Sequence, residues 1–233
     1  MLKRLLDIFV SGTILLILSV PLACIILLLK LTGEKEAFYF QDRVGFLGRI
    51  IKVTKFVTMV KNAPNIGAGD ITLKNDPRVL PVGKVLRKTK LNEVPQFWDV
   101  FVGKLSLVGW RPLMPQGFDD YPQYVKEQII NVKPGITGIG SLVFRDEEAI
   151  IGRAEQDGRD LRSCYRNDIM PYKGALEVWY SNNSGMVTDI KIMVATAIAV
   201  LKPNWNGYQS WFAGLPEPES PIVREHMGLA ICG

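Results

Sequence analysis

The chain opens with an uncharged, apolar run. From Ile8 to Leu29, about 22 residues include no Asp, Glu, Lys or Arg, which is the length that a helix needs to cross the hydrocarbon core of a bilayer. The run continues through leucines to Lys30 without the small residues that mark a signal-peptide cleavage site. The pattern therefore predicts a retained segment that embeds the protein in a membrane.

Basic residues flank this run on both sides, namely Lys3, Arg4, Lys30 and Lys35. Because lysine and arginine gather in cytoplasmic flanks, both ends favour the same side of the membrane. Pro21 removes a backbone donor and can break the helix, and Ser19 can hydrogen-bond a freed carbonyl. On these features alone, a re-entrant helix and a kinked but fully spanning helix are equal alternatives.

Beyond the run, the spacing of apolar positions predicts short strands and several helices. Residues 38–60 alternate apolar and basic positions and are expected to form two strands joined by a turn, the second at 50–53. Helices are predicted at 82–88, about 92–102, 121–132 and 186–201. Residues 61–78 have the composition of a loop, and residues 135–170 show no clear period. The expected fold class is α+β and predominantly helical, with short strands and amphipathic interfacial helices.

Charge is distributed unevenly along the chain. The net charge is +5, but residues 41–111 carry roughly +8 and residues 112–233 roughly −4. A basic block next to a membrane segment favours anionic membrane lipids or a phosphorylated ligand as partners. No recognised nucleic-acid motif accompanies the block, so no nucleic acid is expected. The cysteines are odd in number and far apart, which argues against a disulfide framework or a zinc site.

The stretch before Pro95 holds the first candidate for chemistry. Proline is tolerated in a first helical turn, so a helix is expected to begin just before it, with Asn92 as N-cap and Glu93 at the first helical position. The helix dipole and the nearby Arg87 and Lys90 favour an ionised Glu93. Such a carboxylate can act as a nucleophile or a metal ligand. A glutamate that only stabilises the helix is the alternative.

Arg111 is the second candidate. Val108 and Gly109 resemble a strand end that leads into a tight turn, and Pro112 restricts the backbone of Arg111. A guanidinium on such a turn can hold a phosphate through two parallel hydrogen bonds, although a plain turn arginine is the alternative. The single histidine, His226, lies in the predicted tail, which leaves carboxylate and arginine chemistry. These groups are typical of phosphoryl transfer with a hard cation.

A series of short motifs in a fixed order makes the sequence resemble the bacterial sugar transferases, the monotopic polyprenyl-phosphate phosphoglycosyl transferases. The motifs cover roughly residues 1–200. They lie at residues 3–7, 40–45, 55–59, 76–79, 92–96, 106–112 and 134–138. Each motif is weak alone, but the ordered set is specific to this family.

The resemblance implies a reaction and a place for it. A phosphosugar would pass from a UDP-sugar to a polyprenyl phosphate with release of UMP, which begins the assembly of a capsule, exopolysaccharide or O-antigen. The enzyme would work with Mg²⁺ at the cytoplasmic face of the bacterial inner (plasma) membrane. Ping-pong chemistry would form a covalent phosphosugar on a carboxylate of an Asp-Glu pair. The resemblance also favours the re-entrant helix, broken at Ser19 and Pro21.

The expected domains follow from the same resemblance. Residues 1–35 would form the membrane-embedded re-entrant helix and residues 36–202 the cytoplasmic phosphoglycosyl transferase domain. Residues 203–233 are expected to be an irregular tail. Its aromatic side chains, among them Trp205 and Trp211, give it the composition of an interface, for example in a homodimer.

One departure from the family falls on the chemistry itself. The family's aspartate nucleophile matches Asn92, whose neutral amide cannot attack phosphorus as a carboxylate does. We therefore expect Glu93 to be the catalytic carboxylate, metal ligand and candidate nucleophile, with Asn92 beside it. Direct transfer without a covalent intermediate is one alternative. A non-catalytic membrane scaffold that keeps the fold is another.

Basic residues complete the expected site. The residues expected to bind donor phosphate are Arg111, Arg78, Arg87 and Lys90. Asp76 and Asp168 are expected to be structural or metal-adjacent carboxylates. Trp110 stands where the family usually has proline, and Val57 stands where it usually has arginine. The second change removes one potential phosphate contact.

Overall fold

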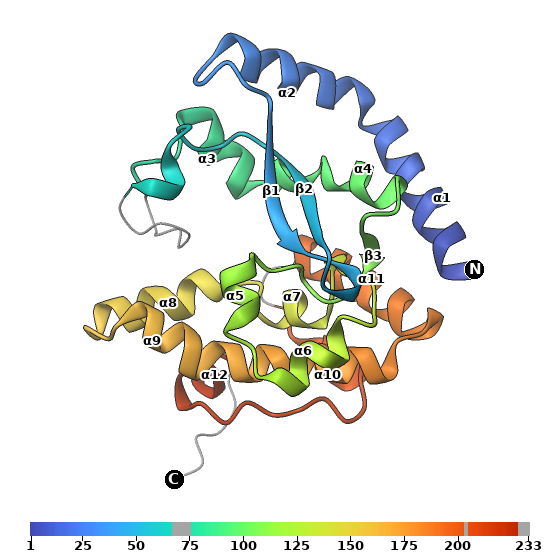
Figure 1. Cartoon of the computed structure of the whole chain (residues 1–233), viewed down its shortest axis with the longest axis vertical. Helices are drawn as coiled ribbons and strands as arrows, with labels where there is room; N and C mark the ends of the chain where they lie inside the picture. The colour runs from blue at the N-terminus through green and yellow to red at the C-terminus, as the bar shows by residue number, and fades with distance from the viewer. Residues whose placement is uncertain (67–75, 203–204, 228–233) are drawn as a thin grey trace. The chain divides into compact units, whose positions relative to one another are not determined.

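The computed structural model describes residues 1–66, 76–202 and 205–227, which belong to two compact units (Figure 1). One unit is made of Met1–Arg43 and Ile50–Ser106, and the other of Val44–Arg49 and Leu107–Gly233. The chain is mostly helical with a few short strands, which confirms the predicted α+β class. The three-part division into 1–35, 36–202 and 203–233 stays a prediction.

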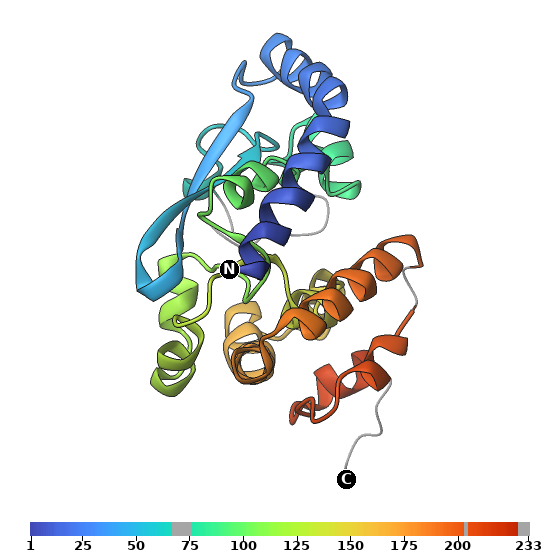
Figure 2. The ribbon, with the colours of Figure 1, turned by 90° about the vertical axis from the view of Figure 1, so that its right-hand side faces the viewer.

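The first unit begins with two helices joined at a bend. Helix α1 (Leu2–Ile17) and helix α2 (Ser19–Leu31) meet at Leu18 at an angle of 64° (Figure 2). The Ser19 hydroxyl donates to the Leu16 carbonyl at 2.8 Å, the kind of bond expected of it at a break. Pro21 lies in the first turn of α2, where its missing N–H leaves no helix bond unmade.

No single helix among the described residues is long and apolar enough to cross a membrane. The bent pair α1 and α2 passes that test only when both helices are taken together, by length and composition.

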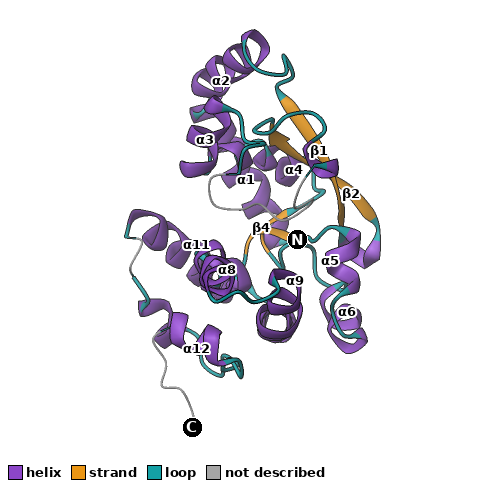
Figure 3. Ribbon diagram, turned by 90° about the vertical axis from the view of Figure 1, so that its left-hand side faces the viewer, coloured by secondary structure: helices purple, strands orange, loops and turns teal. Residues whose placement is uncertain are grey.

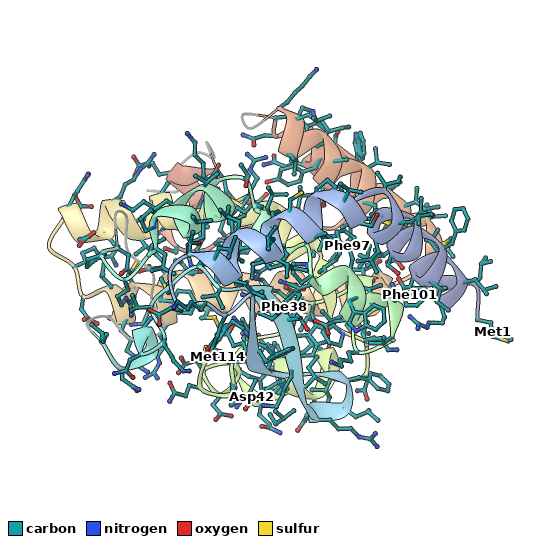
Figure 4. All side chains as sticks on the ribbon, turned by 90° about the horizontal axis from the view of Figure 1, so that it is seen from above. Met1, Phe38, Asp42, Phe97, Phe101 and Met114 are labelled. Carbon is teal, nitrogen blue, oxygen red and sulfur yellow. The ribbon has the colours of Figure 1, made fainter. Side chains whose placement is uncertain are left out.

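Helix α1 packs along helix α4 (Gln96–Phe101) and is hydrogen-bonded to its end (Figure 4). The Arg4 guanidinium donates to the carbonyls of Val100 and Phe101 at 2.6 and 2.7 Å. One turn later, the buried Asp7 carboxylate accepts from the Ser106 hydroxyl at 3.0 and 3.1 Å. These polar contacts fix the orientation of α1 within its unit.

Helix α2 covers the apolar core of the same unit. Strand β1 (Phe38–Val44) pairs with strand β2 (Ile50–Phe56), and helix α3 (Pro81–Lys88) follows. The core cluster consists of Leu29, Ala37, Phe56 and Leu86, and Leu22, Ile25 and Ile26 of α2 pack against it. The two predicted strands are confirmed, and β2 extends three residues beyond its expected end. The predicted helix at 82–88 is confirmed as α3.

The second unit is built from helices around a two-stranded sheet. Strand β3 (Ser106–Val108) pairs with strand β4 (Gly135–Thr137). The α-helices of this unit, purple in Figure 3, are α5 (Pro115–Asp119), α6 (Gln123–Ile129), α7 (Ile139–Val143), α8 (Glu147–Gln156), α9 (Leu161–Cys164), α10 (Met170–Asn183), α11 (Met186–Leu201) and α12 (Pro221–His226). A π-helical turn at Tyr165–Ile169 and a 3-10 helix at Gly207–Trp211 complete the unit.

Several predictions for this part are confirmed and others are wrong. The helix expected at 186–201 is α11, and α6 lies within the helix expected at 121–132. The interval 135–170, where no period was found, contains α7, α8 and α9. Helix α10 was missed because buried Lys173, Gly174 and Glu177 interrupt its apolar pattern.

The stretch after Pro203, expected to be irregular, is partly helical where the structure describes it. Residues 205–227 contain a 3-10 helix and α12. Tyr208, Phe212 and Val223 are buried there. Residues 203–204 and 228–233 lie outside the described residues, and the interface role of the tail stays a prediction.

Candidate functional site

Glu93 lies in a short turn before helix α4. The residues Leu91–Glu93 form a 3-10 helix that begins after Lys90, whose φ of 59° is in the left-handed region. Helix α4 starts only at Gln96, with Pro95 as its N-cap. The expectation that Asn92 caps an α-helix was therefore wrong, because the tighter 3-10 turn takes up the residues ahead of the proline.

A cation lies next to the Glu93 carboxylate. The Lys55 ammonium, on β2, is 3.7 Å from Glu93 Oε1. The two side chains are 18% and 28% exposed, so the pair is partly shielded from water and remains accessible. Lys55 belongs to the motif at residues 55–59, and its sequence context alone predicts no catalytic role. Its place on a strand, well separated from Glu93 in sequence, hid the contact.

Asp99 joins the two segments that carry Lys55 and Glu93 through hydrogen bonds. Its carboxylate is fully buried and accepts from the Thr54 N–H at 2.7 Å and from the Thr54 hydroxyl at 3.0 Å. Thr54 precedes Lys55 on β2, and Asp99 follows Glu93 at the start of α4. These hydrogen bonds therefore tie β2 to α4 and limit how far Lys55 and Glu93 can move apart.

Asn92, which precedes Glu93 in the chain, has a buried side-chain oxygen. Its Oδ1 atom has no hydrogen-bond partner among the described residues. Such an atom costs free energy unless a ligand donor or a cation satisfies it. An amide oxygen and a carboxylate are among the ligands that Mg²⁺ accepts when substrate phosphates supply the others. The described residues include no group of three or more His, Cys, Asp or Glu side chains placed to hold a metal.

Two of the predicted phosphate contacts lie in the same unit as Glu93 and close to it in sequence. Arg87 is half-buried in the last turn of α3, and Lys90 is exposed just before the 3-10 turn. Helix α3 packs against that turn. Both cations therefore belong to the segment that carries Glu93.

Arg78 is held inside the fold of the first unit. Its guanidinium donates to the Asp76 carboxylate at 2.6 and 2.9 Å and to the carbonyls of Ala63 and Ile66 at 2.9 Å each. Both charged side chains are buried. Asp76 thus has a structural role, and the geometry gives no support to a phosphate contact by Arg78.

Arg111 lies in the second unit, on the turn after β3. Its backbone N–H donates to Glu177 Oε1 at 3.3 Å. Gly109 is needed in this turn because a Cβ there would overlap the Lys133 carbonyl oxygen. Trp110 is buried and donates to the Val132 carbonyl at 2.7 Å, so the residue that replaces the family's proline belongs to the core. Glu93 and Arg111 belong to different units, and each is placed within its own.

The Asp168 carboxylate also makes structural contacts. Its carboxylate accepts from Arg159 at 2.8 Å and from the Ser220 hydroxyl at 2.7 Å. It therefore links the start of α12 to the π-helical turn of the same unit.

Glu177 was missed by the sequence reasoning. It is 1% exposed on α10, and burial raises the pKa of its carboxyl to about 7, against the opposing effects of the Arg111 N–H and the Lys173 and Arg111 charges. Its signal in the sequence was a charged residue between apolar positions of a helix, which is costly without a role.

The sequence is similar to a known family and to several named proteins. The model of the family described as "Bacterial sugar transferase" matches residues 1–203. The chain is 41% identical over 140 residues to the UDP-glucose:undecaprenyl-phosphate glucose-1-phosphate transferase of Escherichia coli K12, covering 59% of this chain and 30% of that protein. It is 34% identical over 216 residues to the undecaprenyl-phosphate galactose phosphotransferase of Salmonella typhimurium, covering 86% and 40%.

A shorter relative is matched over nearly its whole length. The chain is 32% identical over 205 residues to the exopolysaccharide production protein PSS of Rhizobium leguminosarum bv. phaseoli, covering 86% of this chain and 95% of that protein. By contrast, the chain spans well under half the length of the Escherichia coli and Salmonella relatives.

Proposed function

Because the chain belongs to the bacterial sugar transferase family, we propose that it transfers a phosphosugar from a UDP-sugar to a membrane polyprenyl phosphate and releases UMP. The relatives, which include undecaprenyl-phosphate glucose and galactose phosphotransferases, support this donor and acceptor. The observation that carries the proposal is the accessible Glu93 carboxylate beside the Lys55 ammonium. The residue before Glu93, Asn92, has an unsatisfied amide oxygen. The step would begin the assembly of a bacterial polysaccharide.

Glu93 is the proposed nucleophile. One of its carboxylate oxygens attacks the phosphorus that bears the sugar, and the bond from that phosphorus to the bridging oxygen breaks, so UMP leaves with that oxygen. A phosphate oxygen of the polyprenyl phosphate then attacks the same phosphorus and frees the Glu93 carboxylate. The lipid product is a polyprenyl diphosphate sugar. Lys55, Arg87 and Lys90, which belong to the same unit as Glu93, offset negative charge on the phosphates during both steps. For Arg111, binding of donor phosphate is a separate proposal.

Mg²⁺ is the proposed cofactor. Glu93 and Asn92 would hold it through oxygen atoms, which suits a hard cation that also binds substrate phosphates. When bound, the ion neutralises charge that develops on the phosphates. A non-catalytic membrane scaffold, the alternative that Asn92 raised, has no observation in its favour.

We further propose that α1 and α2 form a re-entrant element in the inner membrane, with the catalytic residues on the cytoplasmic face. The 64° bend at Leu18 supports a helix that enters and returns. Large apolar side chains are exposed along α1 and on the adjacent face of α4, among them Leu5, Phe9, Trp98 and Phe101. The basic block of residues 41–111 would attract anionic lipid headgroups.

UMP release tests the proposed reaction. The protein, Mg²⁺ and a panel of UDP-sugars are mixed with or without polyprenyl phosphate. One donor should give sustained UMP release with the lipid and at most about one UMP per enzyme without it, as covalent chemistry requires. UMP released only with the lipid would instead indicate direct transfer. No UMP with any donor would contradict the proposed function.

The variant Glu93→Gln tests whether the Glu93 carboxylate takes part in the reaction. This variant should abolish turnover, whereas Glu36→Gln, at an exposed ion pair with Lys61 in the same unit, should leave it unchanged. Retained turnover in Glu93→Gln would remove Glu93 from the chemistry.

A further inference from the structure

Glu177 holds an unusual position under the Arg111 turn. Its carboxylate is 1% exposed, and Oε1 accepts from the Arg111 N–H at 3.3 Å. Oε2 has no hydrogen-bond partner among the described residues. A carboxylate this deeply buried and half satisfied is costly, so its retention in the fold calls for a compensating role.

The start of α7, at Gly138–Gly140, packs directly on this carboxylate. A Cβ at Gly140 would lie 2.5 Å from Glu177 Oε1, and one at Gly138 would lie 4.0 Å from Oε2. The backbone of Gly138 also meets the Arg111 segment, because a Cβ there would overlap the Gly109 carbonyl oxygen. The Glu177 carboxylate therefore lies against two turns at once, the one that carries Arg111 and the one at Gly138–Gly140.

Three titratable groups act on Glu177 from the surrounding elements. Lys173, one turn earlier on α10, pairs with Glu147 of α8 at 2.7 Å and favours the ionised form of Glu177. The Arg111 charge also favours the ionised form of Glu177. The third group is buried Tyr121, whose pKa is raised by the Glu177 charge in addition to burial. Burial opposes Lys173 and Arg111 and raises the pKa of Glu177 to about 7, so its charge changes near neutral pH.

We propose that Glu177 is a positioning residue that fixes the Arg111 turn against the Gly138–Gly140 turn, and so sets how tightly Arg111 holds the diphosphate of the UDP-sugar. This role rests on the proposed function. Glu177 does not touch the donor itself. It acts through the backbone N–H of Arg111, a residue that is itself partly buried.

Steady-state kinetics on the full chain test the role. Glu177→Ala removes the acceptor and should raise the KM for the UDP-sugar about tenfold, with a change in kcat below about twofold. Glu177→Gln keeps an acceptor oxygen and should restore the KM to within about twofold of the wild-type value. Ser181→Ala removes another side-chain bond of α10, to the Gln128 carbonyl, and should lower Tm without changing the KM. A wild-type KM in Glu177→Ala, or equal KM values in the Ala and Gln variants, would overturn the proposal.

A spectroscopic measurement separates this proposal from the proposed reaction. The backbone amide resonance of Arg111, followed by NMR between about pH 6 and pH 8, should shift with a midpoint near 7. The shift should vanish in Glu177→Gln and persist in Glu155→Gln, which makes the same substitution at an exposed position of α8. A flat Arg111 resonance in the wild-type chain would overturn the coupling even if UMP is released. A titrating resonance in a chain that releases no UMP would support the coupling and contradict the proposed function alone.

Discussion

The Lys55 ammonium lies 3.7 Å from the Glu93 carboxylate, and neither side chain is fully covered. The pair joins strand β2 to the turn before α4. Its geometry depends on the hydrogen bonds between Thr54 and Asp99, which join the same two segments. The Glu93 carboxylate and the Lys55 ammonium are thus held together by a buried polar link.

Lys55→Met should lower UMP release at least about tenfold. The substitution keeps most of the side-chain volume and removes the cation that offsets phosphate charge beside Glu93. Lys52→Met provides the matched control, because Lys52 lies on the same strand in an exposed pair with Asp42. An equal loss of activity in both variants would show that Lys55 acts only through the general charge of the strand.

Asn92→Asp should increase kcat at least about tenfold, because it gives Glu93 a second carboxylate as its neighbour in the chain and creates the acidic pair that the resemblance implies. The measurement is UMP release at saturating donor and lipid. Asn182→Asp, on the exposed part of α10, should leave kcat unchanged. A variant with wild-type kcat would mean that Glu93 alone supplies the carboxylate chemistry.

Asp99→Ala should reduce the free energy of unfolding by about 2–3 kcal/mol, because it leaves the buried Thr54 N–H and hydroxyl without their acceptor. A lower Tm in thermal unfolding would report the loss. Asp42→Ala removes an exposed carboxylate paired with Lys52 and should leave Tm unchanged. Equal Tm values for Asp99→Ala and the wild type would contradict the proposed structural link.

Stability should fall as pH rises through the neutral range. Burial raises the pKa of Glu177 from 4.5 to about 7 in the folded chain. Between these values the folded chain holds a proton that the unfolded chain has lost, so raising the pH disfavours folding. The contribution lost between about pH 5 and pH 8 is roughly 3 kcal/mol. Comparing Tm at both pH values should show a smaller drop in Glu177→Gln than in the wild type, and identical drops would contradict the assignment.

Cysteine labelling tests the membrane topology. In a chain whose own cysteines are replaced by alanine, Leu2→Cys and Lys35→Cys place thiols at the two ends of the bent helix pair. A re-entrant element should protect both thiols from an impermeant reagent outside intact cells and expose both after permeabilisation. Labelling of Lys35→Cys alone from outside would indicate a spanning helix instead.

Local patterns predicted the parts of the fold whose polarity is periodic. The strands at 38–56 and the helix at 186–201 followed from alternation and helical spacing, and the break before Pro21 followed from the chemistry of proline. Helix α10 escaped detection because tertiary pairing satisfies its buried charges, Lys173 through Glu147 and Glu177 through the Arg111 N–H. Those partners are 26 and 66 residues away in sequence.

The candidate site, too, could be predicted only where a local sequence pattern indicates it. Glu93 and Arg111 could be selected because each lies next to a proline or glycine that restricts its backbone. Roles for Lys55, Asp99 and Glu177 could not be assigned from sequence, even though Glu177 stands out as a charged residue among apolar ones. Those roles arise from contacts between segments far apart in the chain. Arg78 looked like a free cation in sequence, yet its guanidinium is enclosed by Asp76 and two carbonyl groups.

The hydrogen bonds from α1 to α4 and Ser106 would be lost in a chain shortened at its N-terminus. Removing the first 35 residues would strip Arg4 from the carbonyls of Val100 and Phe101 and Asp7 from the Ser106 hydroxyl. It would also take Leu29 out of the core formed with Phe56 and Leu86. The N-terminal helices are therefore a structural part of the first unit, and the chain with these helices intact is the form in which to study its chemistry.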